Sequence, residues 1–418
     1  MSSEIFYYLF IAFFVVNLIW EVFLNILNLG YLKKIPEIPQ LFKGKFEIDV
    51  YEKGKTYSRA NLQFSNASSF YTSLVTLIIL FSGFLPWLNK LIEEKIAGNL
   101  NQGVTFFIIL FSIFTISGIP FNLYKTFNIE MKFGFNKMTF GLYIVDFIKH
   151  SLLAAVIGVP VLYAVLWFFS IAGTYWWVLV LVFVFSLQLI FMIAYPMWIA
   201  PLFNKYESLK EGELKTSLMK MALAAEFPLV DIFVMDGSKR SSHSNAYFTG
   251  FGKFRRIVLY DTLIEQMNTK ELTAVLAHEI GHYKKGHIYK LISGSFLMIA
   301  INLWILSLFI DWSPLYQTFG FADKPVHVGI FLFFTCFSIF TFFLSPMMNI
   351  FSRKYEYEAD AYSVEICGES QSMKDALIKL TEKNLSNLTP HPLYSFVYYS
   401  HPTVIERISA ISKSENNN

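Results

Sequence analysis

Residues 278–310 read HEIGHYKKGHIYKLISGSFLMIAINLWILSLFI, a His-Glu-x-x-His motif that is followed closely by a long apolar stretch. Residues four apart lie on one face of a helix, so His278 and His282 can bind the same metal ion. Glu279 then lies beside the metal, where its carboxylate can take a proton from metal-bound water. This arrangement is typical of zinc peptidases. The alternative is a chance match on an amphipathic helix, with both histidines solvated or packed.

The composition indicates a polytopic membrane protein. Of the 418 residues, 55% are hydrophobic and only 16% are charged, whereas a soluble chain has about 25% charged residues. The net charge of +3 and the lack of a dense basic run give no reason to expect a nucleic acid as partner. Seven stretches are long and apolar enough to cross a bilayer: Ile5–Leu29, Phe70–Leu88, Val104–Leu123, Ser151–Ile171, Trp176–Ile199, Leu291–Ile310 and Val328–Met348.

The charges of the loops indicate the orientation of these spans. The loops after the first, third and fifth spans are rich in lysine and arginine, including Lys33, Lys132 and Arg240. The loop after the sixth span, Asp311–His327, has a single basic residue of this kind, Lys324. The positive-inside rule therefore places the N-terminus in the lumen or outside and the C-terminus in the cytosol. The membrane would be the endoplasmic reticulum in a eukaryote and the inner membrane in a bacterium.

The spans divide the chain into four parts. Residues 1–200 contain membrane helices one to five with cytosolic loops, and residues 291–350 contain helices six and seven. Residues 201–290 form a protease segment on the cytosolic side, and residues 351–418 form a C-terminal protease segment with the third metal ligand. Because the motif lies immediately before the sixth span, we expect its site to face substrates held in or near the bilayer.

A catalytic zinc ion usually has three protein ligands, so one is still required. Glu356, just past the seventh span, is the best candidate. Glu358 is the alternative, and because it projects about 200° away from Glu356 on a helix, only one of the two can face the metal. Asp360 shares the face of Glu356 and could orient a zinc histidine by accepting its second N–H, or handle a proton.

A β-hairpin is predicted upstream of the motif. An alternating stretch that begins at His243 leads through Gly250-Phe251-Gly252 into Arg256–Tyr260. An edge strand beside the zinc could pair with an extended peptide, to which Asn245 and Ala246 would offer hydrogen bonds. We therefore take His243, Asn245 and Ala246 as candidate substrate-binding residues; the alternative is a hairpin that makes no substrate contact.

The chain resembles the integral-membrane zinc endopeptidases of the CAAX prenyl protease 1 type, the farnesylated-protein-converting enzymes. Their signature pairs His-Glu-x-x-His with Asn-x-x-Ser-Arg-x-x-Glu-x-x-Ala-Asp, and residues Asn349 to Asp360 match every fixed position. The segments from Ser242 to Tyr247 and from His401 to Ile408 are also similar. The resemblance implies that one Zn²⁺ is held by His278, His282 and Glu356.

The resemblance also implies the remaining roles and the fold. Glu279 would be the general base, and Asp360 a second catalytic carboxylate. Seven transmembrane helices would surround a large water-filled intramembrane chamber. A zincin-like, mainly α metalloprotease domain with a small β-hairpin would cap the chamber on the cytosolic side.

Four further residues have expected parts in this picture. His401 is our candidate for stabilising the tetrahedral oxyanion; alternatively it caps the turn before the last helix. Arg353 is expected to form a structural ion pair rather than to take part in catalysis. Asn349 is expected to support the zinc-binding helix. His287 is expected to be an interfacial group or to contact a ligand rather than the metal.

The leading functional hypothesis is removal of the C-terminal tripeptide of isoprenylated CAAX proteins or peptides. The partners would be that substrate and membrane lipid, and no oligomer is required. A second hypothesis is a quality-control protease of the bacterial heat-shock type. A third is a membrane transporter or scaffold with a structural zinc, which would need a fourth protein ligand, often cysteine; neither Cys336 nor Cys367 is near the motif.

Overall fold

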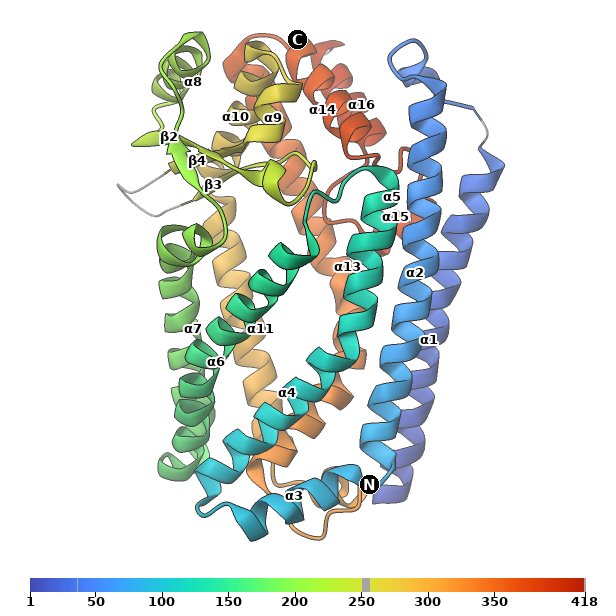
Figure 1. Ribbon diagram of the computed structural model, residues 1–418, viewed down its shortest axis with the longest axis vertical. Coiled ribbons are helices and arrows are strands. Elements are labelled where there is room, and N and C mark those ends of the chain that lie inside the picture. Colours follow the sequence, from blue (N-terminus) through green and yellow to red (C-terminus); the bar gives the residue numbers. More distant parts are fainter. Residues whose placement is uncertain (36, 250–255, 417–418) are drawn as a thin grey trace.

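The computed structural model describes residues 1–35, 37–249 and 256–416, and it is mostly helical (Figure 1). The helices of the membrane region are α1 (Ser3–Lys34), α2 (Ile48–Phe81), α3 (Phe84–Lys95), α4 (Asn99–Tyr124), α5 (Met131–Phe133), α6 (Phe140–Ile171), α7 (Trp176–Ala194), α11 (His287–Phe309), α12 (Ser313–Gln317) and α13 (Val326–Cys367). The remaining helices are α8 (Glu213–Ala224), α9 (Asp261–Gln266), α10 (Thr269–Lys284), α14 (Gln371–Lys383), α15 (Pro392–Tyr398) and α16 (Val404–Asn416).

Within the described residues, 6 helices are long and apolar enough to cross a membrane, and there are up to 7 when the bent helix α13 is counted as one span. α13 bends by 61° between Phe340 and Phe342. Beyond the bend it continues to Cys367, well past the predicted end of the seventh span at Met348. The prediction of a polytopic α-helical protein with seven spans is therefore confirmed.

The predicted second span was wrong in its bounds. Phe70–Leu88 is not one helix, because α2 begins at Ile48 and ends at Phe81. Gly83 then adopts a left-handed φ of 77°, which favours glycine and breaks the helix. α3 starts at Phe84, is only 12 residues long, and buries Leu85, Leu88 and Ile92 within the protein, so it does not continue the membrane crossing.

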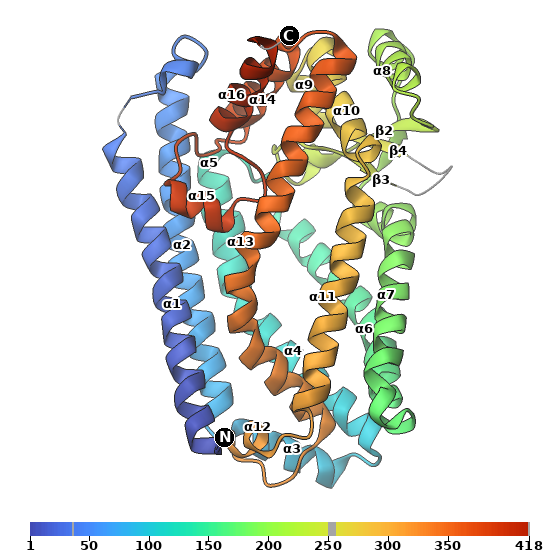
Figure 2. The same ribbon diagram turned by 180° about the vertical axis from the view of Figure 1, so that it is seen from behind.

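Figures 1 and 2 show the helices standing around a common interior. α1 and α2 lie side by side on one edge, and α6, α7 and α11 lie together on the opposite edge. α3 and α12 lie at the end that carries the N-terminus. The helices α8 to α10, α14 and α16 lie at the other end with the C-terminus, so the protease elements cap one end of the ring.

The interior contains a cavity of about 860 Å³, which we call the chamber. α2 lines one side through Tyr57, Asn61 and Ser65, and α14 with the segment from Tyr398 to Arg407 lines the other. A smaller cavity of about 330 Å³ adjoins it and shares His401 and Arg407 as lining residues. The chamber therefore lies between the first two membrane helices and the protease cap.

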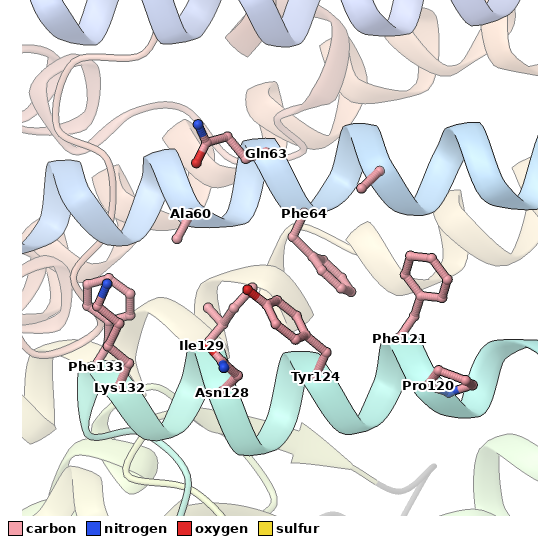
Figure 3. Close-up of a pocket in the computed structure, with 11 residues that line it drawn as sticks. Ala60, Gln63, Phe64, Pro120, Phe121, Tyr124, Asn128, Ile129, Lys132 and Phe133 are labelled. Atoms are coloured by element: carbon pink, nitrogen blue, oxygen red, sulfur yellow. The ribbon is translucent and has the colours of Figure 1, made fainter.

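A groove of about 540 Å³ between α2 and α4 is distinct from the chamber (Figure 3). Ala60 and Gln63 of α2 and Tyr124 of α4 contribute to its walls. Gln63 projects about 200° away from Asn61 on α2, and Asn61 faces the chamber.

The protease region contains a four-stranded mixed sheet rather than the predicted hairpin alone. Its strands are β1 (Tyr206–Ser208), β2 (Asp231–Met235), β3 (Ala246–Thr249) and β4 (Arg256–Tyr260), in the order β1-β2-β4-β3. β3 and β4 are antiparallel, as predicted, with Tyr247 opposite Val258, whereas β2 and β4 are parallel. The predicted turn at Gly250-Phe251-Gly252 lies outside the described residues. Within the described sheet, β3 is an edge strand.

A partly buried ion pair connects the membrane ring to the protease region. Arg240, which follows β2, donates two hydrogen bonds of 2.8 and 3.0 Å to the carboxylate of Asp146 in α6. The same guanidinium donates to Asn204 at 3.0 Å. Because a bidentate pair of this kind restricts both distance and angle, it holds the sheet over the ring.

Candidate metal centre

The helix that carries the His-Glu-x-x-His motif begins at a capping box. The side chain of Asn268 accepts from the backbone N–H of Glu271 at 3.0 Å, and the carboxylate of Glu271 accepts from the N–H of Asn268 at 2.9 Å. Leu272, Leu276 and Ile280 are buried on the inner side of α10. These features start the helix and determine its rotation, which turns His278 and His282 toward α13.

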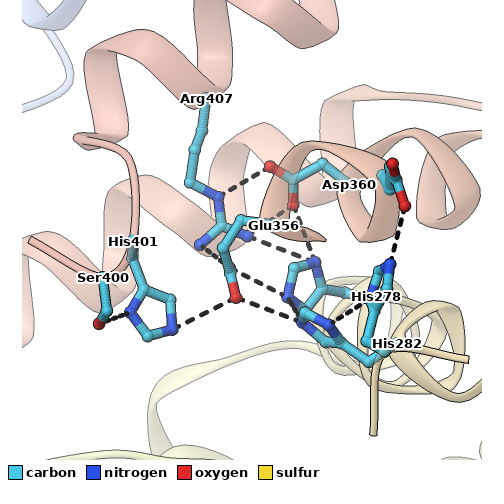
Figure 4. Close-up of polar contacts among 9 residues, drawn as sticks. His278, His282, Glu356, Asp360, Ser400, His401 and Arg407 are labelled. Carbon is cyan, nitrogen blue, oxygen red and sulfur yellow. Dashed lines mark hydrogen bonds and ion pairs between the residues drawn. The ribbon is translucent and has the colours of Figure 1, made fainter. Parts of the chain in front are cut away.

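Three side chains converge on one point (Figure 4). His278 Nε2 lies 3.1 Å from His282 Nε2 and 3.4 Å from Glu356 Oε2, and His282 Nε2 lies 3.3 Å from Glu356 Oε1. Ligand atoms 2.0–2.1 Å from a tetrahedral zinc ion are about 3.3 Å apart. The spacing of the donors therefore fits one ion of this size.

The site favours a cation in other ways as well. Glu356 Oε2 is buried and has no hydrogen-bond partner within the described residues, although His278 and Arg407 lie near it. Burial lowers the pKa of His278, but the carboxylates of Asp360 and Glu356 beside it outweigh that effect and raise the pKa to about 9. The surroundings thus stabilise positive charge at the point where the ligands meet. No cysteine belongs to the described ligand group, as a closed structural site would require.

Glu356 reaches the histidines because α10 and α13 approach very closely. A Cβ atom on Gly281 would lie 3.1 Å from the Cα and carbonyl oxygen of Ala359. Near this contact, Ser363 Oγ donates to the carbonyl of Ala274 at 2.7 Å. The glycine within the motif therefore determines how near the third donor can come.

Of the two glutamates that the sequence left open, Glu356 faces the histidines. Glu358 projects away and accepts from His287 Nε2 at 2.8 Å. His287 in turn contacts His282, with 2.9 Å between the two Nδ1 atoms. The expectation that His287 contacts a ligand rather than joining the donor group agrees with this geometry.

A buried carboxylate and a buried arginine lie behind His278. Asp360 Oδ1 lies 2.9 Å from His278 Nδ1, so the ring N–H can donate to it. Arg407 of α16 donates to Asp360 Oδ2 at 2.8 Å, and its Nη1 lies 3.3 Å from Glu356 Oε2. We did not predict Arg407 as a site residue; its place in a segment similar to the CAAX prenyl protease 1 type was the available signal.

Glu279 lines the smaller cavity with the three donors. Burial raises its pKa, while the adjacent histidines His278 and His282 act against that shift. A carboxylate with a raised pKa beside a metal is a stronger base than an exposed one. The arrangement can therefore support proton transfer at this point.

The candidate oxyanion and substrate residues lie at two different places. His401 Nε2 is 3.3 Å from Glu356 Oε1, and Asn245 and Ala246 line the same small cavity as the metal donors. His243 lies farther away. Its ring stacks on Phe135 with centroids 3.9 Å apart. It also contacts Glu130 and Asn384 at 3.3 and 3.1 Å, and it lines the chamber.

Asn349 and Arg353 contact the segment that leads to His401. Asn349 donates to the carbonyl of Val397 at 2.7 Å and not to the zinc-binding helix. Arg353 Nη1 donates to the carbonyls of Phe396 and Tyr399 at 3.1 and 2.7 Å, in place of the expected ion pair. Both side chains satisfy the carbonyls that the C-terminal end of α15 leaves unpaired, and they hold the segment that leads to His401.

Comparisons with known proteins agree with this architecture. Residues 28–205 match a family model described as CAAX prenyl protease N-terminal, five membrane helices, and residues 208–415 match peptidase family M48. The CAAX prenyl protease 1 homolog of Arabidopsis thaliana is 37% identical over 413 residues, which cover 96% of each chain. The CAAX prenyl protease 1 of Saccharomyces cerevisiae is 37% identical, with 90% of this chain and 88% of the relative covered. The Homo sapiens homolog is 32% identical, with 94% and 92% covered.

The crystal structure of S. mikatae Ste24p superimposes with a TM-score of 0.92 at 36% identity and covers 97% of this chain and 98% of that chain. The similarity thus extends over the membrane ring and the protease cap together. From its sequence, its architecture and its metal-binding group, the chain belongs to the CAAX prenyl protease 1 family within peptidase family M48 and is a multi-pass membrane metalloprotease.

Proposed function

We propose that this enzyme is a zinc-dependent endopeptidase that removes the C-terminal tripeptide of isoprenylated CAAX proteins or peptides. The observation that carries the proposal is the group of His278, His282 and Glu356, which shares a cavity with Glu279 and adjoins the chamber. Relatives named CAAX prenyl protease 1 support the substrate class. A chamber within a membrane ring suits a substrate that carries both a lipid and a peptide.

One Zn²⁺ is the proposed cofactor, held by His278, His282 and Glu356. Two imidazole nitrogens and one carboxylate, without a fourth protein donor, are the ligand set of many catalytic zinc sites. When bound, the ion would polarise the scissile carbonyl and make water more acidic. Asp360 would keep His278 in the tautomer that offers Nε2 to the metal, which its 2.9 Å contact with Nδ1 supports.

Glu279 is the proposed general base. It would take the proton of the attacking water and deliver it to the nitrogen of the leaving tripeptide. His401 would donate to the oxyanion of the tetrahedral intermediate, because its ring lies at the same cavity as the donors. Asp360, which accepts from His278 and Arg407, is better placed to position the histidine than to deliver a proton itself.

The substrate would bind as an extended strand along the edge of β3. Asn245 and Ala246 would supply hydrogen bonds at the small cavity, since both line it beside the metal donors. His243 would contact the portion of the substrate in the chamber. The lipid chain would remain with the membrane helices or the bilayer itself.

We also propose that the protein has the orientation that the charges of its loops predict, and that it lies in the endoplasmic reticulum. The N-terminus would be lumenal, and the protease cap would lie on the cytosolic side, where prenylated proteins are exposed. The named relatives come from eukaryotes, which supports the endoplasmic reticulum over a bacterial inner membrane. The four-part division at residues 200, 290 and 350 is retained, and no oligomer is required.

The test is cleavage of a farnesylated CAAX peptide by the purified protein in detergent, with the unprenylated peptide alongside. Glu279→Gln should strongly reduce cleavage, and a zinc chelator should abolish it. Glu365→Gln, an exposed position on α13, should leave it unchanged and controls for loss of a carboxylate. Cleavage that requires the lipid would support the proposal. Equal cleavage of both peptides, still dependent on Glu279, would overturn the substrate class and favour broader turnover of membrane proteins.

A further inference from the structure

His287 lies at an abrupt corner between two helices. α10 ends at Lys284, Gly286 adopts a left-handed φ of 67°, and α11 begins at His287. The imidazole of His287 is only 1% exposed, and it stacks on Tyr355 of α13 with centroids 4.3 Å apart. The corner and the stacking together hold the ring against His282.

The two ring nitrogens of His287 have different partners. Nε2 lies 2.8 Å from Glu358 Oε2, and Nδ1 lies 2.9 Å from His282 Nδ1. Lys290 and Lys354 lie 3.9 and 3.8 Å from the carboxylate of Glu358 and favour its ionised form. An ionised carboxylate can only accept, so His287 Nε2 carries the proton in this contact.

The position of this proton determines the rest of the chain of hydrogen bonds. A neutral His287 that is protonated on Nε2 offers a bare Nδ1, which can only accept. His282 must then donate from its own Nδ1, and its Nε2 is left with a free lone pair. That nitrogen is the one that lies 3.1 Å from His278 Nε2 and 3.3 Å from Glu356 Oε1. The contacts therefore select the tautomer of His282 that a metal ion requires.

We infer that His287 is a positioning residue that connects the charge of Glu358 to the metal-binding histidine His282. The two histidines then have separate supports. His278 donates directly to Asp360, whereas His282 donates to an imidazole that donates to Glu358. This inference rests on the proposed zinc site, but it is independent of the proposed substrate.

The test is the zinc dissociation constant, measured by competition with a chelating indicator on purified protein without substrate. His287→Leu removes both nitrogens while keeping a similar volume, and the constant should rise about 10–100-fold. His287→Asn keeps an acceptor near the position of Nδ1 and should recover most of that loss. Glu358→Gln keeps an acceptor but removes its charge, and it should give an intermediate rise.

His327→Leu is the matched control, because it removes another buried histidine, one that contacts Asn89 at 2.8 Å near the start of α13, on the other side of the helix bend from Glu356. Its zinc affinity should equal that of the wild type even if its melting temperature falls. Zinc affinity in His287→Leu within twofold of the wild type would overturn the inference and leave the zinc site standing. Equal losses in His287→Leu and His287→Asn would also overturn it, because packing rather than the accepted hydrogen bond would then be responsible. A wild type that binds no zinc would overturn both proposals.

Discussion

The buried pair of Arg407 and Asp360 makes a strong prediction about stability. The two side chains are 12% and 3% exposed, and Arg407 also lies 3.3 Å from Glu356. Arg407→Met removes the cation but leaves the carboxylate of Asp360 buried with His278 as its remaining partner among these contacts. Leaving one member of a buried pair uncompensated costs about 3–5 kcal/mol of unfolding free energy.

The expected change in melting temperature follows from the size of the unit that unfolds. The M48 segment spans residues 208–415. If it unfolds as one unit, an entropy of about 2.1 cal/mol/K per residue amounts to about 0.4 kcal/mol/K, so Tm should fall by about 7–11 °C. The double variant Arg407→Met with Asp360→Asn removes both charges and should regain about 1–3 kcal/mol of the loss.

Tryptophan fluorescence of zinc-saturated protein in detergent, heated at one fixed rate, measures these differences. Lys43→Met serves as the control. The side chains of Lys43 and its ion-pair partner Glu37 are 54% and 80% exposed, so loss of this pair should leave Tm unchanged. If the double variant melts at or below the temperature of Arg407→Met, the two charges are not coupled and the reasoning is refuted.

Three other substitutions test the metal centre. Glu279→Gln should lower kcat by about 100- to 10,000-fold while zinc content, measured by elemental analysis, stays at the wild-type level; loss of the metal would mean that this residue is a ligand. Glu356→Ala should lose the ion, whereas Glu365→Ala on the same helix should keep it, and equal zinc contents would contradict the ligand assignment. Gly281→Ala should destabilise the protein by about 1–3 kcal/mol, because its Cβ meets the backbone of Ala359 at 3.1 Å; an unchanged Tm would show that α10 and α13 can separate without cost.

The donors on α10 could be predicted because their relation is local. His278 and His282 are four residues apart, and any helix brings them to one face. The choice between Glu356 and Glu358 could not be made from spacing, since it depends on how α13 rotates against α10. That rotation is determined by the close contact of Gly281 with Ala359, which involves residues far apart in the sequence.

Arg407, the end of the second span and two strands were also not predicted correctly, because they too depend on contacts between distant parts of the chain. Arg407 is 47 residues from Asp360, and a lone arginine on a C-terminal helix resembles an exposed charge until the fold buries it. The end of the second span was misplaced because hydropathy does not distinguish apolar residues that face lipid from those, such as Leu85 of α3, that pack inside the protein. Strands β1 and β2 were also missed: β1 is only 3 residues long, and β2 pairs in parallel with β4, a partner that does not follow it directly in the sequence.

Both helices that carry the metal donors continue into membrane helices. α10 passes through a short corner into α11, and Glu356 lies within α13 itself, beyond its bend of 61°. Membrane helices change their tilt when the thickness of the bilayer differs from their apolar length. A change in tilt of α11 relative to α13 would alter the separation of His282 and Glu356. The lipid composition of the membrane should therefore influence the geometry of the metal centre, and detergents of different chain length are not equivalent media for this enzyme.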